Sequence, residues 1–283
     1  FPYTTLFRSH QRIARDGAEV LSAGAIGVGA LKSIRCGRGL GDSLYLQAVV
    51  RLMLAKNTAI SFKVKSDYPD VFSQLGNRVS VVPFDRNVDI TAHYSVRKGV
   101  PGTTQWQDCC IAAGISRDSE MHIDWRATNT ALVEQIKAPG KPIVVVQMPR
   151  PPMGRTDGFG ASLLPDCSAI QRLIREAKTT HTVVQIGAGK NIYTFDGIDF
   201  DLSNRTTVAD ALDVASVADR FLGYCSFLVP MAESFSRPAL FVWSHRGLRD
   251  PQPFVRRITP QKVLHKPTSR FVMDNATEAQ LLE

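Results

Sequence analysis

Apolar residues along this chain switch repeatedly between short continuous runs and a helical spacing. The continuous runs have the length of strands and lie at 31–36, 59–65, 79–84, 143–148, 182–186, 221–224 and 239–243. Between the runs the spacing is that of one helix face, as in the series Leu46, Val49, Val50, Met53 and Leu54. Apolar strands that alternate with helices are typical of parallel sheets covered on both faces, so the pattern predicts an α/β fold.

Further elements follow from weaker patterns and from capping residues. Helices are expected at 68–75, 104–113, 128–138, 208–218 and 231–235, and a strand is expected at 89–95. Thr207 and Asp210 have the spacing of a capping pair at a helix start. Asp166 or Ser168 is expected to cap another helix, which turns Ile170, Leu173, Ile174 and Ala177 inward.

A proline- and glycine-rich stretch at 139–142 predicts the boundary between two domains. The expected division is a first domain at 10–138, a linker at 139–142 and a second domain at 143–250. The basic segment 251–283 is expected either to return to the first domain, with a short helix at 275–282, or to form a solvated tail.

The first nine residues, FPYTTLFRS, match what a common sequencing-adapter oligonucleotide encodes when it is translated. We therefore expect residues 1–9 to be non-native and set them aside from the fold. Phe1 then does not define the natural start of the chain, and a signal peptide upstream is not excluded.

Composition narrows the class of protein. Of 283 residues, 44% are hydrophobic and 21% are charged, which is typical of a globular chain, and no apolar run approaches the ~20 residues of a membrane span. The net charge of +8 favours acidic partners such as nucleotide phosphates or an anionic glycolipid surface, unless the basic surface serves only solubility. Nucleic acid is not expected as a partner, because basic and aromatic residues do not interleave.

The cysteines and histidines predict no metal site. Five cysteines include no C-x-x-C pair, which favours a reduced, cytoplasmic protein without structural zinc. Cys109 and Cys110 fall on the apolar face of a helix and are expected to pack in the core. His93 and His122 have no partners at metal-ligand spacing, so we expect structural or surface roles for both.

A glycine-rich loop, Gly37 to Ser43, joins a predicted strand to a predicted helix. Its glycines let a ligand approach the main chain, and the free amides at a helix start attract anions. The spacing G-x-G-x-G differs from the G-x-G-x-x-G fingerprint of dinucleotide-binding proteins. Asp42 in this loop is either the N-cap of the helix or a reacting carboxylate.

A second loop that suits an anion follows the strand at 221–224. Cys225 and Ser226 lie between this strand and the next helix, and parallel sheets bind ligands at the carboxyl ends of their strands.

These loops belong to a set of motifs that resembles glycosyltransferase family 9, the heptosyltransferase-like enzymes. The motifs that carry the resemblance are Gly39-Leu40-Gly41-Asp42-Ser43-Leu44, Asp201-Leu202-Ser203-Asn204-Arg205-Thr206-Thr207, Ala218-Asp219, Gly223-Tyr224-Cys225-Ser226 and Arg237-Pro238. In the run that the family writes G-N-D-S-G-x-x-H, Cys225 replaces Asp, Phe227 replaces Gly and Pro230 replaces His in this chain.

The resemblance implies a GT-B architecture, in which two Rossmann-like domains with parallel sheets face each other across a cleft. It implies an inverting, metal-independent transfer of a sugar from a nucleotide-diphosphate donor to an acceptor hydroxyl, with no further cofactor. The acceptor would be a glycan or glycolipid, and the family suggests ADP-heptose and lipopolysaccharide core. Such an enzyme would be cytoplasmic or peripheral to the inner membrane. The alternative is a catalytically inactive GT-B binding or scaffold protein, which the replacements at Cys225, Phe227 and Pro230 favour.

The resemblance also implies roles for individual residues. Asp42 would be the base that takes the acceptor proton. The residues expected at the donor are Gly39, Gly41, Arg150, Arg155, Gly187, Gly189, Cys225 and Ser226. Arg150 and Arg155 enter only through the position of their loop, where the family carries a basic group, and a solvated loop is the alternative.

Overall fold

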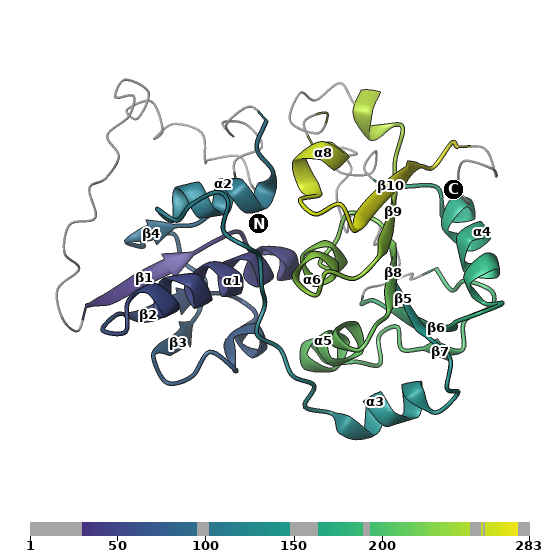
Figure 1. The fold of residues 1–283 in the computed structure, drawn as a ribbon, viewed down its shortest axis with the longest axis horizontal. Coiled ribbons are helices and arrows are strands. Elements are labelled where there is room, and N and C mark those ends of the chain that lie inside the picture. Colours follow the sequence, from purple (N-terminus) through teal and green to yellow (C-terminus); the bar gives the residue numbers. More distant parts are fainter. Residues whose placement is uncertain are drawn as a thin grey trace.

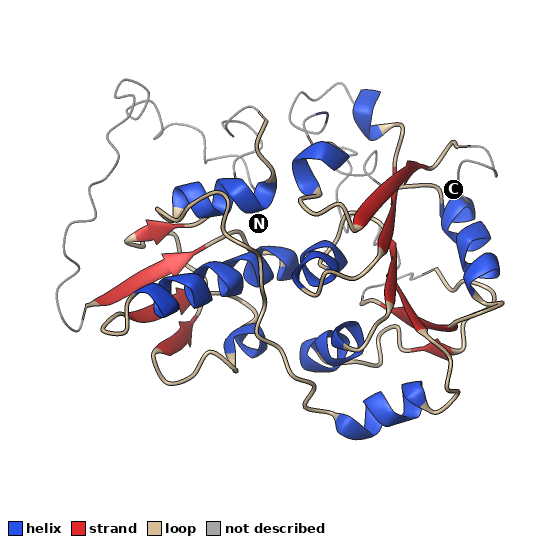
Figure 2. Ribbon diagram, in the orientation of Figure 1, coloured by secondary structure: helices blue, strands red, loops and turns tan. Residues whose placement is uncertain are grey.

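The computed structural model describes residues 30–94, 102–147, 164–188, 193–249, 256 and 258–276. They form two lobes, each built on a parallel sheet with helices packed against it (Figure 1; Figure 2). The α/β class predicted from the apolar pattern is confirmed. Among the described helices, none combines the length and apolar content that a membrane span requires.

The first lobe contains a sheet of strand order β3-β2-β1-β4, in which every pair is parallel. Its strands are β1 (Leu31–Arg35), β2 (Ser61–Lys65), β3 (Val79–Val82) and β4 (Ile90–Thr91). Its helices are α1 (Leu40–Lys56), the 3-10 helix η1 (Pro69–Phe72) and α2 (Gln105–Ala112). All of these were expected, although β3, β4 and η1 are shorter than the sequence pattern predicts.

The second lobe contains a parallel sheet of order β10-β9-β8-β5-β6-β7. Its strands are β5 (Ile143–Gln147), β6 (Thr182–Ile186), β7 (Phe200–Asp201), β8 (Arg220–Gly223), β9 (Ala239–Trp243) and β10 (Ser269–Met273). Its longer helices are α3 (Thr130–Lys137), α4 (Cys167–Ala177), α5 (Val208–Ser216) and α6 (Leu228–Ser234). The short helices η3 (Gly247–Arg249) and α8 (Pro260–Val263) follow β9.

Helices cover the second sheet on both faces. α4 lies on the outer face, and α5 and α6 lie on the face toward the first lobe (Figure 1). Asp166 caps α4 by accepting a hydrogen bond from Ser168 N at 2.9 Å, and Thr207 and Asp210 form the expected capping box of α5. The prediction for α6 was wrong at its start, because the helix begins at Leu228 rather than Met231.

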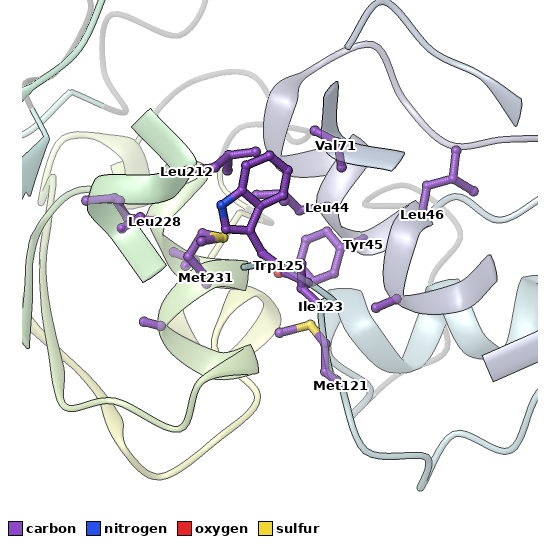
Figure 3. Close-up of a cluster of buried hydrophobic side chains, with 14 of the residues drawn as sticks. Leu44, Tyr45, Leu46, Val71, Met121, Ile123, Trp125, Leu212, Leu228 and Met231 are labelled. Atoms are coloured by element: carbon purple, nitrogen blue, oxygen red, sulfur yellow. The ribbon is translucent and has the colours of Figure 1, made fainter. Parts of the chain in front are cut away.

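A hydrophobic cluster joins the two lobes where α1 meets α6. Figure 3 shows Leu44 and Tyr45 of α1 packed near Leu228 and Met231 of α6, with Trp125 between them. Because α1 contacts both its own sheet and the second lobe, its first half is buried almost all round rather than along a single stripe. The lobes therefore share one continuous core at this point.

The chain crosses between the lobes before α3, earlier than the stretch at 139–142. α3 packs on α5 in the second lobe, as Figure 1 shows. The preceding segment is held by both lobes, because Gln47 pairs with both backbone groups of Asp124, and Ile123 N donates to Ser234 Oγ at 2.6 Å. We therefore propose that the joint between the lobes is the segment 121–129.

The basic C-terminal segment contacts the first lobe through α8. Lys262 Nζ lies 2.6 Å from Asp108 Oδ2 on α2, and both side chains are largely buried. Thr104 Oγ1 and His265 Nδ1 form a second link at 3.1 Å. β10 then joins the second sheet as an edge strand, so this part of the chain ties the lobes together; the helix expected at 275–282 lies mostly outside the described residues.

Glu233 on α6 is expected to make the stability of the fold depend on pH. Its carboxylate accepts hydrogen bonds from His265 N at 2.5 Å and from Lys266 N at 3.2 Å, and the side chain has no exposed surface. Burial raises the pKa of this carboxyl from 4.5 to about 7. The folded state therefore holds the proton more tightly than the unfolded state, and the free energy of unfolding is expected to fall by about 1.4 kcal/mol per pH unit as the pH rises through this interval.

The substitution Glu233→Gln is expected to remove this slope, since the amide oxygen still accepts hydrogen bonds and no charge forms. Urea denaturation between about pH 5 and pH 8 measures the difference between the variant and the wild type. Glu134→Gln on the exposed face of α3 is the matched control and should follow the wild-type curve. Curves for Glu233→Gln and wild type that stay parallel would show that Glu233 ionises without cost.

Candidate functional site

The best candidate site lies where the carboxyl end of β1, the first turn of α1 and the loop after β8 come together. Asp42 is at its centre, with Cys36 at the end of β1 and His93 after β4 in the same lobe. The second lobe contributes Cys225, whose thiol interacts electrostatically with the carboxylate of Asp42. The glycine-rich loop and the loop after β8, expected separately from the sequence, are therefore parts of one site.

The carboxylate of Asp42 is held on one side and free on the other. Gly39, not Asp42, is the N-cap of α1, so the N-cap interpretation of Asp42 was wrong. Asp42 is the third residue of the first turn, and its Oδ2 accepts a hydrogen bond from Gly39 N at 2.9 Å. Its Oδ1 is buried and has no hydrogen-bond partner among the described residues. A carboxylate fixed in this way presents one oxygen for chemistry.

The glycines of the loop make room for this carboxylate. A Cβ on Gly37 would lie 2.2 Å from Asp42 Oδ2, and one on Gly39 would lie 3.1 Å from the same atom. Since the amide of Gly39 already donates to Asp42, it is not free for a donor phosphate. The glycines were expected to admit a ligand, and the structure shows that two of them accommodate Asp42.

Aromatic and imidazole rings enclose the site. His93 stacks on Tyr94 with ring centroids 4.7 Å apart and planes 16° apart. Burial lowers the pKa of His93, while the negative charge of Asp42 acts in the opposite direction. Burial also raises the pKa of the Tyr94 hydroxyl, and the carboxylate of Asp42 adds to this effect. At neutral pH the phenol is therefore protonated.

The loop after β8 provides less for an anion than the sequence suggests. Burial raises the pKa of the Cys225 thiol to about 12, with a further contribution from Asp42, so the thiol is neutral. Ser226 Oγ accepts from Leu228 N at 3.2 Å, which occupies one of the free amides at the start of α6. A Cβ on Gly41 would lie 3.5 Å from Phe227 Cα, so a side chain at this position would touch the loop after β8.

Of the four other expected donor residues, Gly187 lies within the described part of the chain. Gly187 follows β6 with φ of +151°, which favours glycine, and its carbonyl accepts from Asn204 N at 2.8 Å. The structure thus gives this loop a fixed partner in the turn before α5. Arg150, Arg155 and Gly189 lie outside the described residues.

Two cations that the sequence analysis did not single out lie on the same edge of the first sheet. The guanidinium carbons of Arg35 and Arg38 lie 5.7 Å and 5.2 Å from the ring centroid of Phe84. Arg38 also pairs with Asp67 at 2.9 Å. Their positions close before and inside the glycine-rich loop were the available signal.

Comparison with known proteins supports the fold. No protein-family model and no curated protein matches the chain. Among solved structures, the dodecameric iron-containing glycosyltransferase TibC of E. coli is 13% identical with a TM-score of 0.54, over 84% of this chain and 63% of that one. A family 9 glycosyl transferase from Veillonella parvula is 8% identical with a TM-score of 0.54, over 85% of each chain. The E. coli heptosyltransferase WaaC, solved with ADP, is 10% identical with a TM-score of 0.54, over 89% and 95%.

The chain spans less than two thirds of the length of TibC but most of the length of the other two structures. At sequence identities of 13%, 8% and 10%, the similarity to these structures shows the fold alone. The chain has the GT-B fold, two lobes on parallel sheets, that is found in family 9 glycosyltransferases.

Proposed function

We propose that this protein is a glycosyltransferase that uses a nucleotide-diphosphate sugar, with Asp42 as the catalytic base. The observation that carries the proposal is the position of Asp42 at the meeting of the lobes, with Oδ2 held by Gly39 N and Oδ1 buried without a partner among the described residues. A base needs an oriented carboxylate with a lone pair directed at the proton that it removes. The fold supports the proposal because heptosyltransferases share it.

The proposed step is a single displacement. Asp42 Oδ1 accepts the proton of the acceptor hydroxyl while the acceptor oxygen forms a bond to the anomeric carbon. The bond from this carbon to the diphosphate oxygen breaks, and the leaving nucleoside diphosphate keeps the electron pair. Attack opposite the leaving group inverts the configuration, and the described residues that we assign to the step need no metal ion.

The leaving diphosphate requires positive groups. We assign this role to Arg150 and Arg155, which follow β5 in the sequence, because guanidinium groups bind phosphate oxygens bidentately. The backbone of the loops at Gly187, Gly189 and Ser226 is proposed to border the nucleotide. Arg35 and Arg38 at the edge of the first sheet are proposed to face the acceptor.

The ligands of two structurally similar proteins suggest the class of donor. WaaC was solved with ADP, and TibC was solved with ADP-D-β-D-heptose. We therefore propose a nucleoside diphosphate sugar as donor and a glycan or glycolipid as acceptor, related to lipopolysaccharide or another surface glycan. A cytoplasmic protein that works at the inner face of the membrane fits this acceptor.

A second candidate function is binding without catalysis. The family's Asp is replaced by Cys225, whose thiol is neutral, and the family's Gly is replaced by Phe227, which lies close to Gly41. These two features reduce the polar groups that the loop after β8 offers to a donor. A GT-B scaffold protein would keep the interlobe core and lose the donor.

Thermal unfolding in the presence of ADP, GDP, UDP and CDP, each with its sugars, separates the two candidates. A ligand that binds the native state at 100 times its Kd stabilises it by about 2.7 kcal/mol, so selective stabilisation by one diphosphate is expected. The matching nucleoside monophosphates and inorganic phosphate are the controls for nonspecific anion binding. If no diphosphate shifts the transition, the scaffold function is favoured.

A further inference from the structure

We propose that Cys36, Asp42 and His93 form a binding site for a divalent transition metal ion of the zinc type, and that a bound ion inhibits transfer. The inhibition rests on the proposed function, whereas the metal site does not. The sequence predicts no such site, because His93 has no partner at metal-ligand spacing along the chain. The fold brings the three residues together.

Three elements of the first lobe supply the three ligands. Cys36 follows β1, Asp42 lies in the first turn of α1 and His93 follows β4, so all three lie at the carboxyl edge of one sheet. Their ligand atoms lie within 4.8 Å of one another. Ligands of a tetrahedral zinc ion are about 3.3 to 3.8 Å apart, given zinc distances of about 2.0 to 2.3 Å, so side-chain shifts of about 1 Å would close the site.

One oxygen in this cluster lacks a partner. Oδ1 of Asp42 is buried without a hydrogen bond from any described residue, while Oδ2 is already bound to Gly39 N. A buried polar oxygen left unpaired is costly, and a bound cation would satisfy it. The stacking of His93 on Tyr94 orients the second ligand before any ion arrives.

The donor set selects the class of metal. A sulfur, an imidazole nitrogen and a carboxylate oxygen together suit Zn²⁺ and similar ions, whereas Mg²⁺ and Ca²⁺ prefer oxygen ligands alone. Three protein ligands leave a fourth position for water. The same residue types could instead form a nucleophilic Cys-His-Asp set, but Cys36 has no exposed surface and cannot reach a substrate.

Metal binding and base catalysis would use the same atom. The proposed base is Oδ1 of Asp42, and an ion on this oxygen takes the lone pair that would accept the acceptor proton. Zinc is therefore expected to inhibit transfer by occupying the base, without blocking the nucleotide.

The test is a titration of the reduced full chain with Co²⁺, which replaces Zn²⁺ and absorbs light. A charge-transfer band from thiolate to Co²⁺ in the near ultraviolet is expected, with intense visible bands of a four-coordinate ion, and Zn²⁺ should displace both. In Cys36→Ser the charge-transfer band should disappear. In His93→Gln and in Asp42→Asn the affinity for Co²⁺ should fall more than about 10-fold, since even supporting residues of a metal site have effects of this size.

Cys167→Ser is the matched control, because Cys167 lies on α4 of the other lobe and outside the cluster. It should leave the spectrum unchanged. Absence of a charge-transfer band in the wild type, or a band that survives in Cys36→Ser, would overturn the proposal. If Cys36→Ser does not fold, His93→Gln provides the test, because His93 is partly exposed. An unchanged affinity of His93→Gln for Co²⁺ would also overturn the proposal.

The titration is read from absorbance and needs no donor or acceptor. A protein that binds Co²⁺ through Cys36 but transfers no sugar would refute the proposed function and keep the metal site. A protein that transfers sugar and binds no Co²⁺ would refute the metal site and keep the proposed function.

Discussion

Replacement of Asp42 by Asn is expected to lower kcat for sugar transfer by about 100- to 10,000-fold, the range that general base catalysis contributes. The amide oxygen of Asn can still accept the hydrogen bond from Gly39 N, so the first turn of α1 should keep this bond. The amide nitrogen cannot accept a proton from an acceptor hydroxyl. Binding of the nucleoside diphosphate should stay within a factor of about two, because the site assigns the diphosphate to other groups.

The control for this variant is Asp210→Asn. Asp210 is the third residue of α5, and its carboxylate accepts a hydrogen bond from Thr207 N of the N-cap, as that of Asp42 does from Gly39 N. Loss of charge at a capping box is thus tested away from the site, and Asp210→Asn should transfer sugar at the wild-type rate. Steady-state kinetics with the donor identified by thermal shift measures both variants. Wild-type turnover in Asp42→Asn would leave Asp42 as a capping residue only.

The sequence predicted those elements of the fold whose residues are apolar and central. β6 and β9 were predicted with the residues that they have, and β5 was predicted from its first residue. All three strands lie inside the sheet, where both faces are covered, so their side chains form continuous apolar runs. β7 and β10 were missed because edge strands carry polar and charged residues, as Arg270 shows in β10.

The site was predictable in part for a related reason. Asp42 stood out because it lies in a glycine-rich loop between a strand and a helix, all within one local stretch. Its neighbours Cys36, His93 and Cys225 come from separate elements, and only the packing of the two lobes brings Cys225 to Asp42. Local sequence carries no signal for such contacts. The role of Gly37 was hidden for the same reason, since only the structure shows the carboxylate that it accommodates.

The joint between the lobes was also beyond the sequence. A Pro-Gly stretch indicates a turn, and the turn at Gly140 is present with a φ of +70°. The turn connects α3 to β5 within the second lobe, however, whereas the chain crosses earlier, in a segment with buried aromatic and aliphatic residues. Composition indicates a linker where residues are polar or where Pro and Gly interrupt secondary structure. The segment that joins the lobes is instead apolar, because it is part of the shared core.

Asp213 is expected to be the residue on which this joint depends most. It lies on α5 with no exposed surface, and its carboxylate accepts four hydrogen bonds from the crossing segment. Trp125 Nε1 donates to Oδ1 at 2.8 Å, while Oδ2 accepts from Thr128 N at 3.0 Å, Thr128 Oγ1 at 3.1 Å and Asn129 N at 2.6 Å. No other described carboxylate holds this segment to α5 with as many bonds.

Asp213→Ala is expected to lower the free energy of unfolding by more than about 3 kcal/mol, because several donors are left buried without a partner at about 1 to 3 kcal/mol each. Asp124→Ala in the same segment is the control: its side chain is 40% exposed and pairs with Arg51, so about 1 kcal/mol or less should be lost. Urea denaturation at constant pH measures both. A loss in Asp213→Ala no larger than that in the control would mean that the apolar contacts of Trp125 hold the joint without the carboxylate. A large loss would show that the attachment of the crossing segment to α5 depends on the Asp213 carboxylate.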